Sequence, residues 1–413
     1  MMALLDASGW AAAADASEAD VVIVNSCGFI ESAKRESINA VLQWRKLYPQ
    51  KKILLAGCLA QRYAEALSES LPEANGFFGV DNINNIAEKV NSLVHSSFAI
   101  PHSSFALSSR PLLSLPGSAY VKISEGCGNC CSYCAIPLIR GPLRCRSVPD
   151  IVKECRGLLA RGIKELCIIG QDICAYRRGS NGLPELLNAI AKIKGSFRVR
   201  LLYMHPDHFP LAVLDLMEQD SRFLPYFGIP FQHASPQILS AMNRRGSSGK
   251  YLALVKAIRS RLPAAVIRTT FLVGFPGETD ADFAALLDFQ KKLRADWLGC
   301  FAYSREEGTP AWAMQPRVPK KTAAQRKRAV ESCQVPITEK RMDRFAGQTL
   351  DVLLEEQVGN FWLGRLYCHA PDVDGAAVVT GIGASSGCGA EAGGIVPCKV
   401  IARRGIDLEV AKI

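Results

Sequence analysis

The stretch SEGCGNCCSYCAIP, residues 124–137, decides the fold. It follows an apolar run, AYVKIS (119–124), and it spaces Cys127, Cys131 and Cys134 so that three thiolates fall in one tight loop. Three thiolates can ligate three irons of a cubane and leave the fourth iron open to a small molecule, and thiolates suit iron-sulfur clusters. The loop therefore predicts a 4Fe-4S cluster held by these three cysteines.

Two other interpretations of the loop are weaker. A zinc knuckle normally takes its fourth ligand from a second Cys or His pair at finger spacing, and no such pair follows. The cysteines could instead form two CxxC pairs, Cys127 with Cys130 and Cys131 with Cys134. The CxxxCxxC spacing is favoured because it lies where the first rim loop of a barrel is expected. We interpret Cys130 as a bystander.

Beyond the loop, apolar strand-like runs alternate with helical segments. With residues 119–124 they make six strands; the further five are KELCIIGQD (164–172), VRLLYMHP (199–206), YFGIPFQHAS (226–235), VIRTTFLVGFPGE (266–278) and WLGCFAYS (297–304). This alternation implies parallel pairing in a closed or partly closed (β/α) barrel over residues 118–343, with polar residues at its rim.

Two further strand-like runs lie upstream, VVIVNSC (21–27) and KILLAGC (52–58), with a helix-compatible segment between them. This βαβ pattern places Cys27 and Cys58 at strand C-termini, where open α/β sheets bind their ligands. We expect a flavodoxin-like α/β domain over residues 1–95, followed by a Ser- and Pro-rich linker over 96–117.

The last part of the chain, residues 344–413, has short alternating strands broken by glycine-rich turns, and a basic helical stretch (319–345) leads into it. This pattern fits a small five-stranded barrel of the OB type. The glycine run GIGASSGCG (381–389) is interpreted as a hairpin loop and not as a phosphate loop, because no helix follows it.

Composition limits the class of protein. The N-terminus has no signal-peptide pattern, and no apolar run approaches the ~20 residues that cross a bilayer. We expect a cytoplasmic protein without a membrane segment, whose 15 cysteines serve metal or redox chemistry or pack as small hydrophobes, and do not form a disulfide framework. The net charge of +10 suggests an anionic partner.

The cysteine spacing, with an aromatic residue before the last cysteine, resembles the radical S-adenosylmethionine (SAM) superfamily. The resemblance implies that the open iron binds SAM and that an electron cleaves it to methionine and a 5′-deoxyadenosyl radical. The GQD segment (170–172) and TTFLVGFPGET (269–279) look like the superfamily's SAM-contacting strands. The implied cofactor-binding residues are Tyr133, Gln171, Asp172, Gly274, Gly277 and Glu278.

Nearly the whole chain resembles the methylthiotransferase family, in NSCGFIESAKRES (25–37), AGCLAQRY (56–63), the cysteine loop and VGFPGET (273–279). Members carry an N-terminal α/β domain with a second 4Fe-4S cluster, a radical SAM barrel and a small barrel called TRAM. They insert sulfur into an unactivated C–H bond and add a methyl group from a second SAM. The resemblance implies that Cys27 and Cys58 ligate the auxiliary cluster. The family's first ligand lies upstream of Met1, so we expect a start assigned too late or a truncated form.

The substrate is indicated by two segments, IPFQHASPQIL (229–239) and GRLYCHAPDVDG (364–375). They resemble the group that methylthiolates an aspartate β-carbon in a small-subunit ribosomal protein, with transfer RNA adenosine as the alternative. Residues 344–413 carry six Lys or Arg against eight Asp or Glu, which suits a basic protein better than RNA phosphates. We expect Asp372 and Asp374 in the docking surface, or as turn-forming residues beside Gly375.

Other partners follow from the chemistry and the charge. The reaction needs an electron donor and a sulfur donor. From Arg317 to Arg344 there are nine Lys or Arg against three Asp or Glu, which allows contact with ribosomal RNA, although an ordinary solvated helix face is the simpler explanation of the run. A non-catalytic iron-sulfur or zinc protein that binds ribosomes is the third class. His205 and His233 follow strands and could face SAM or the target carboxylate, and we assign neither a catalytic role.

Overall fold

The structure, a computed structural model, describes residues 1–94, 112, 114–179, 181–381 and 391–413. Most of the expected linker (96–117) and nearly all of the glycine run 381–389 lie outside the described residues. The chain gathers into two compact units. The first comprises Met1–Leu112, Gly126–Leu143 and Ser304–Ala313, and the second comprises Leu113–Glu125, Arg144–Tyr303 and Met314–Ile413.

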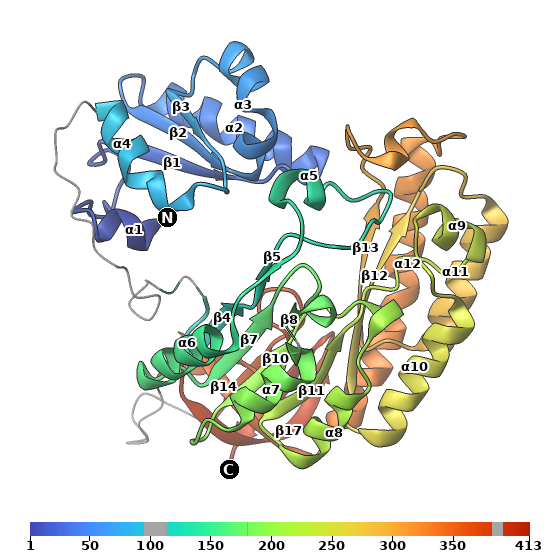
Figure 1. Cartoon of the computed structure of the whole chain (residues 1–413). Coiled ribbons are helices and arrows are strands. Elements are labelled where there is room, and N and C mark those ends of the chain that lie inside the picture. Colours follow the sequence, from blue (N-terminus) through green and yellow to red (C-terminus); the bar gives the residue numbers. More distant parts are fainter. Residues whose placement is uncertain (95–111, 113, 180, 382–390) are drawn as a thin grey trace. The chain divides into compact units, whose positions relative to one another are not determined.

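The first unit is built on a three-stranded parallel sheet in the order β1-β2-β3 (Figure 1). Its strands are β1 (Val21–Ser26), β2 (Lys52–Gly57) and β3 (Gly76–Phe78). Alternate residues of a strand point to opposite faces, so Ile53 and Leu55 pack on one side with helices α2 (Glu31–Leu47) and α3 (Cys58–Ser70). Leu54 and Ala56 pack on the other side against α4 (Ile86–Val94). The predicted βαβ pattern is confirmed.

A buried carboxylate ties the segment 304–313 to the helices of the first unit. Glu306 is 2% exposed, and its carboxylate lies 2.8 Å from Nζ of Lys34 in α2 and 2.8 Å from a guanidinium nitrogen of Arg62 in α3. Two cations balance one buried anion, as a buried charge requires. The remaining short elements of this unit are α1 (Met2–Asp6), η1 (Ile83–Asn85), α5 (Ile136–Arg140) and η5 (Pro310–Ala313).

The second unit contains a six-stranded parallel sheet in the order β13-β12-β11-β10-β7-β4. All six strands lie within the predicted runs or overlap them, so the partly closed barrel is confirmed. The strands are β4 (Ser118–Lys122), β7 (Glu165–Ile169), β10 (Arg198–Leu201), β11 (Phe223–Gly228), β12 (Val266–Val273) and β13 (Trp297–Ala302).

Seven α-helices among the described residues of this unit accompany the sheet. They are α6 (Val148–Ala160), α7 (Leu183–Ala191), α8 (Ala212–Gln219), α9 (Pro236–Ala241), α10 (Ser248–Arg261), α11 (Asp280–Leu293) and α12 (Lys320–Met342). Shorter elements are β5 (Ser124–Glu125), β6 (Arg144–Cys145), β8 (Arg177–Arg178), β9 (Asn181–Gly182), η3 (Ile173–Ala175), η4 (Pro206–His208) and η6 (Asp343–Phe345).

The C-terminal part forms a closed five-stranded barrel in the order β14-β15-β16-β18-β17, as predicted (Figure 1). Its strands are β14 (Thr349–Val358), β15 (Phe361–Arg365), β16 (Ala377–Thr380), β17 (Ile395–Arg404) and β18 (Asp407–Lys412). One apolar cluster joins Tyr226, Val266 and Trp297 of the sheet to the interior of this barrel. The barrel and the sheet therefore share a hydrophobic core.

Buried polar contacts cross the same interface. Glu165 at the start of β7 bonds to Arg200 of β10 (3.1 Å) and to Arg365 of β15 (2.8 Å), and all three side chains are at most 3% exposed. The indole nitrogen of Trp297 donates to the carbonyl oxygen of Cys368 (2.7 Å). These directional contacts fix how the barrel sits on the sheet, because a buried charge left unpaired is costly.

Candidate functional site

The cysteine loop belongs to the first unit, and its backbone is tightly turned. Gly126 has a φ of +70°, and a Cβ there would lie 2.2 Å from the carbonyl oxygen of Pro142, so only glycine fits. The amide of Cys127 donates to Gly141 (3.3 Å), and the amide of Cys134 donates to the carbonyl of Cys131 (3.1 Å). These bonds close the loop around the three predicted ligands.

The structure brings the three predicted thiols together. The pKa of Cys134 is raised to about 12, chiefly by burial and also by the charges of the neighbouring Cys131 and Cys127, while a backbone hydrogen bond at Ile136 opposes the rise. Mutual repulsion of three thiolates is relieved when a cation binds among them, and soft thiolates suit iron. The donor set therefore fits an iron-sulfur cluster. Cys130, by contrast, is exposed.

Tyr133 lies between two of the ligands and is half-buried. The residue before it, Ser132, is buried and accepts a hydrogen bond from the amide of Ala311 in η5 (2.9 Å). The segment 304–313 therefore supports the loop from within the same unit. Contact between Tyr133 and SAM stays a prediction.

The structure also brings Cys27 and Cys58 to neighbouring strand ends. Ser26 of β1 pairs with Gly57 of β2, and each cysteine is the next residue along its chain segment. The backbone approaches closely here, because a Cβ on Gly28 would lie 2.7 Å from the carbonyl oxygen of Cys58. The two cysteines thus lie at the same edge of the sheet, as predicted.

Positive charge surrounds the sulfur of Cys58. Cys58 is the first residue of helix α3, whose N-terminal end carries the positive pole of the helix dipole. A guanidinium nitrogen of Arg140 in α5 lies 3.4 Å from its Sγ. Both stabilise a negatively charged ligand. Arg140 carries no local sequence signal for this role, because it is separated from Cys58 by 82 residues and only the fold brings the two together.

Two of the predicted SAM contacts, Gln171 and Asp172, follow β7 in the second unit, and they differ in exposure. Gln171 is exposed at the C-terminal end of the strand. Asp172 is 3% exposed, and its carboxylate accepts from the amides of Cys174 (3.0 Å) and His205 (3.3 Å) and lies 2.6 Å from Nε2 of His208. Asp172 therefore fixes two loops together, whereas Gln171 is available to a ligand.

The VGFPGE turn after β12 is held by its own glutamate. Glu278 is buried, accepts hydrogen bonds from the amides of Gly274 and Phe275, and pairs with Arg326 of α12 (3.0 Å). Burial raises the pKa of Glu278, and Arg326 opposes that rise. Gly274 and Gly277 have φ values of +73° and +83°, which favour glycine. The carboxylate of Glu278 thus shapes the turn, and contact of the turn with SAM stays a prediction.

The docking role predicted for Asp374 is wrong in this structure. Its side chain is fully buried, accepts from the hydroxyl of Tyr226 (2.6 Å) and pairs with Arg268 (3.0 Å). Burial raises the pKa of Asp374, with Arg268 opposing that rise. Asp374 therefore joins the terminal barrel to β11 and β12. Asp372 is exposed, with a φ of +65°, and its docking role stays a prediction.

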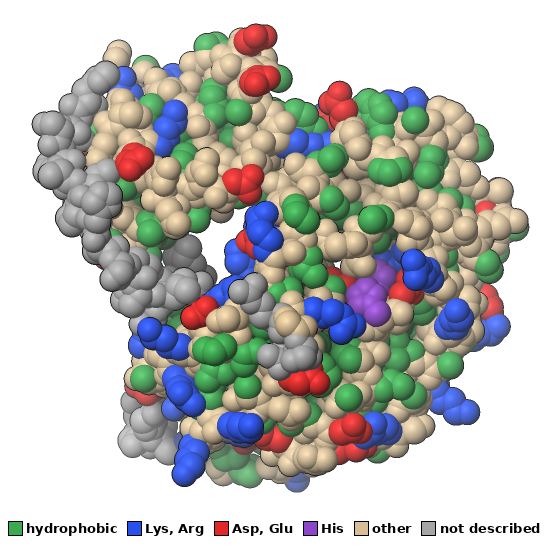
Figure 2. Space-filling model, viewed as in Figure 1, with side chains coloured by type: hydrophobic (Ala, Val, Ile, Leu, Met, Phe, Trp, Pro, Cys, Tyr) green, Lys and Arg blue, Asp and Glu red, His purple; other side chains and the backbone are tan. Residues whose placement is uncertain are grey.

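The histidines divide into two kinds. His233 and His369 are both 0% exposed. Burial lowers the pKa of His233 to about 4 and that of His369 to about 3, so both are neutral at pH 7. Because these two are interior, the histidine surface in Figure 2 belongs to His205 and His208. The sequence analysis named His205 and missed His208, although the HPDH segment that carries both was a visible signal.

The sheet, the cysteine loop and the small barrel define a radical SAM protein. Residues 121–289 match the model of the radical SAM superfamily, residues 1–79 match that of uncharacterized protein family UPF0004, and residues 346–413 match the TRAM domain. Among solved structures, the radical S-adenosylmethionine methyltransferase TsrM of Kitasatospora setae has a TM-score of 0.54 at 16% identity, covering 70% of this chain and 63% of that one. That likeness concerns the fold.

Curated relatives narrow the class. The chain is 44% identical to the ribosomal protein uS12 methylthiotransferase RimO of Treponema denticola, over 100% of this chain and 97% of that protein. It is 38% identical to the protein of the same name from Thermotoga maritima, over 89% of this chain and 87% of the relative. The chain therefore belongs to the RimO family of radical SAM methylthiotransferases.

Proposed function

We propose that the chain methylthiolates one aspartate of ribosomal protein uS12 at its β-carbon. The single observation that carries this proposal is the convergence of the thiols of Cys127, Cys131 and Cys134 in a chain that matches uS12 methylthiotransferases over nearly their full length. The mildly acidic terminal barrel supports a basic protein substrate.

When bound, the 4Fe-4S cluster and SAM supply an electron and a 5′-deoxyadenosyl radical that removes hydrogen from carbon. The chain's own residues hold and aim these groups. Cys127, Cys131 and Cys134 hold the cluster and leave one iron for SAM. Gln171 offers an exposed side chain and Gly277 an open backbone position after the C-terminal ends of parallel strands, where ligands of such sheets bind. Gly274 lies against Ala323 of α12 and shapes the turn.

We also propose that Cys27 and Cys58 ligate a second 4Fe-4S cluster, from which sulfur reaches the substrate. Their position at paired strand ends and the positive charge of Arg140 beside Cys58 support this. An electron donor and a sulfur donor are then required as partners. The basic helix α12 offers a surface for ribosomal RNA. No helix in the described part of the chain is long and apolar enough to cross a membrane, and a ribosomal substrate favours action in the cytoplasm.

The test is product analysis by mass spectrometry. The chain, anaerobically reconstituted with iron and sulfide, is given SAM, a reductant and uS12 or a uS12 peptide. We expect the mass of one methylthio group in place of one hydrogen on the aspartate, and no product from a Cys127, Cys131 and Cys134 triple-alanine variant. Modification of transfer RNA adenosine with uS12 left unmodified would overturn the proposal in favour of the RNA substrate.

A further inference from the structure

A group of polar side chains lies beyond the ends of β7 and β10 in the second unit. The carboxylate of Asp172, 4% exposed, bonds Nε2 of His208 at 2.6 Å, and the rings of His205 and His208 stack with centroids 4.7 Å apart. The His208 side chain is 35% exposed. Within the described part of the chain its Nδ1 has no hydrogen-bond partner, so this nitrogen can bind a ligand.

The loop that carries His208 is held firmly. Asp207 accepts from the amide of Arg245 (2.8 Å) and from the hydroxyl of Tyr251 (3.3 Å), while its own amide donates to Nδ1 of His205 (3.3 Å). The half-exposed imidazole therefore stands on a fixed backbone. Such support is what orients a binding group before its ligand arrives.

A metal site is the first alternative, since ligand atoms of Asp172, His205 and His208 all lie within 4.8 Å of one another. Two ligand atoms on one transition metal, each about 2.0–2.2 Å from it, are about 3 Å or more apart. The 2.6 Å between Asp172 and His208 is shorter than that and is a hydrogen-bond distance. The geometry is that of a carboxylate that orients an imidazole.

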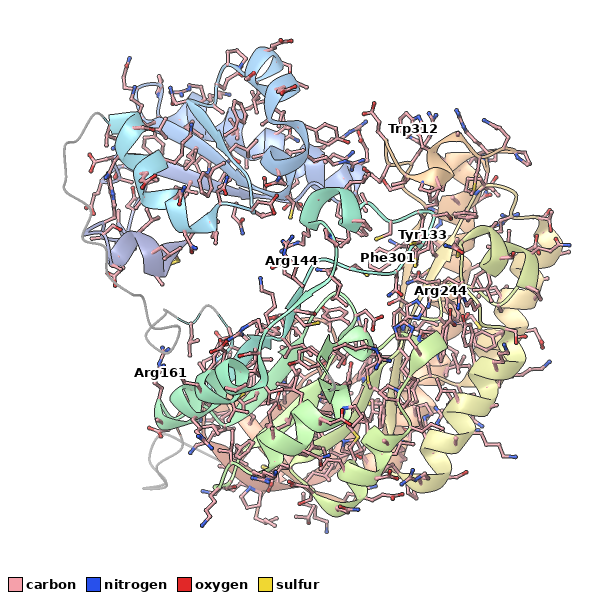
Figure 3. All side chains as sticks on the ribbon, in the orientation of Figure 1. Tyr133, Arg144, Arg161, Arg244, Phe301 and Trp312 are labelled. Atoms are coloured by element: carbon pink, nitrogen blue, oxygen red, sulfur yellow. The ribbon has the colours of Figure 1, made fainter. Side chains whose placement is uncertain are left out.

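The carboxylates of the group have partners of their own, and one buried cation, Arg244, lies close to it. Both carboxylates nearby, Asp172 and Asp207, are engaged in the bonds described above. The Arg244 guanidinium lies close enough to His205 to act on its protonation: burial first, then Arg244, lowers the pKa of His205 to about 4. Figure 2 shows the histidine surface beside both basic and acidic side chains, and Figure 3 places Arg244 at the end of the sheet where Phe301 also lies.

We propose that His208, oriented by Asp172, binds the side-chain carboxylate of the substrate aspartate. Its Nε2–H is given to Asp172, so it is as the imidazolium that His208 donates its Nδ1–H to the substrate, and Asp172 is the positioning residue. This inference rests on the proposed function and deepens it. That carboxylate is bonded to the carbon that reacts, so a donor on it aligns the β C–H bond and distinguishes aspartate from asparagine. An adenine ring offers no such anion.

The experiment compares the wild-type full chain with His208→Ala and Asp172→Asn, using uS12 peptides that carry Asp or Asn at the target position. His208→Ala removes a charge-assisted hydrogen bond, so kcat/KM for the Asp peptide should fall by about tenfold to a hundredfold. Most of this fall should come from a higher KM. The preference for Asp over Asn disappears in this variant, and Asp172→Asn shows a smaller loss of the same kind. Arg161→Ala, which removes an exposed cation at the end of α6, is the control and retains the preference.

Peptide binding, measured by fluorescence anisotropy without turnover, separates this inference from the proposed function. If the wild type binds the Asp peptide more tightly than the Asn peptide and His208→Ala does not, the inference is supported even when no product forms. Absence of product alone counts against the proposed function. Unchanged Asp preference in His208→Ala overturns the inference. A loss of SAM affinity in His208→Ala equal to its loss of Asp-peptide affinity would also overturn the inference, because it would assign His208 to the SAM carboxylate. Loss of a bound zinc or manganese ion in this variant would overturn it by making the group a metal site.

Discussion

Replacing Glu165 by Gln should destabilise the second unit by about 3–5 kcal/mol, because it leaves buried cations without their anion. Arg200 is 0% exposed, and Glu165 is its ion-pair partner at 3.1 Å. Its guanidinium also donates to the neutral carbonyl of Tyr367 (2.8 Å) and lies over the ring of Tyr226, and neither contact supplies a negative charge. In the variant Arg365 still pairs with a second carboxylate, that of Glu355. Most of the destabilisation therefore comes from the unpaired charge of Arg200. For a unit of this size the midpoint of thermal unfolding should fall by roughly 6–20 °C, at about 2–4 °C per kcal/mol.

The pH dependence of this variant gives a second measurement. Burial alone would raise the pKa of Glu165, but Arg200 and Arg365 outweigh burial and lower it to about 2. A lowered folded-state pKa stabilises the protein above the ordinary value of 4.5, and that stability is lost as the pH falls through about 2. The difference between wild type and Glu165→Gln should therefore stay constant from about pH 8 to pH 5 and shrink below that.

Thermal unfolding followed by circular dichroism is the assay, with Asp288→Asn as the matched control. Asp288→Asn also removes a carboxylate that is paired, here with Lys292 at 2.6 Å. Asp288 and Lys292 are 60% and 61% exposed, so the loss of stability should be below about 1 kcal/mol. Equal shifts of the two variants would refute the reasoning that burial of the ion pair attaches the barrel to the sheet.

Three further predictions concern the clusters and the docking surface. Cys130→Ala should keep the iron content of the wild type, whereas Cys131→Ala should lose about four irons per chain; equal losses would show that Cys130 is a ligand. Gly28→Ala places a Cβ 2.7 Å from the carbonyl oxygen of Cys58, so it should lower the auxiliary iron while the loop cluster stays, and full iron content would contradict this. Asp372→Ala should raise the KM for a uS12 peptide without changing the unfolding midpoint, and a changed midpoint with the same KM would assign Asp372 to the turn.

Features encoded locally were predictable from the sequence. β1, β2 and the six strands of the larger sheet fall within or overlap apolar runs, and the three cluster cysteines lie within eight residues, so neither needs knowledge of the tertiary fold. β3, only three residues long, was not predicted. Strand ends were predicted less well. The run VRLLYMHP extends to residue 206, but β10 ends at Leu201, because Tyr203 adopts a φ of +67° and the amide of Met204 bonds to Gly228.

Features that depend on distant residues were missed. Both aspartates of the PDVDG segment were predicted in a docking surface because the terminal barrel is mildly acidic, with a turn beside Gly375 as the alternative. The burial of Asp374 depends on Arg268, 106 residues away, and local sequence carries no sign of that pairing. The same holds for Asp172 and His208, 36 residues apart, which the fold joins at the ends of β7 and β10.

The central claim is tested most directly by following one hydrogen atom. A uS12 peptide carrying deuterium at the β-carbon of the target aspartate is incubated with the reconstituted chain, SAM and a reductant, and the 5′-deoxyadenosine is analysed by mass spectrometry. We expect deuterium in the 5′-deoxyadenosine together with a methylthio group on the peptide. 5′-Deoxyadenosine that forms without deuterium in the presence of bound peptide would contradict it.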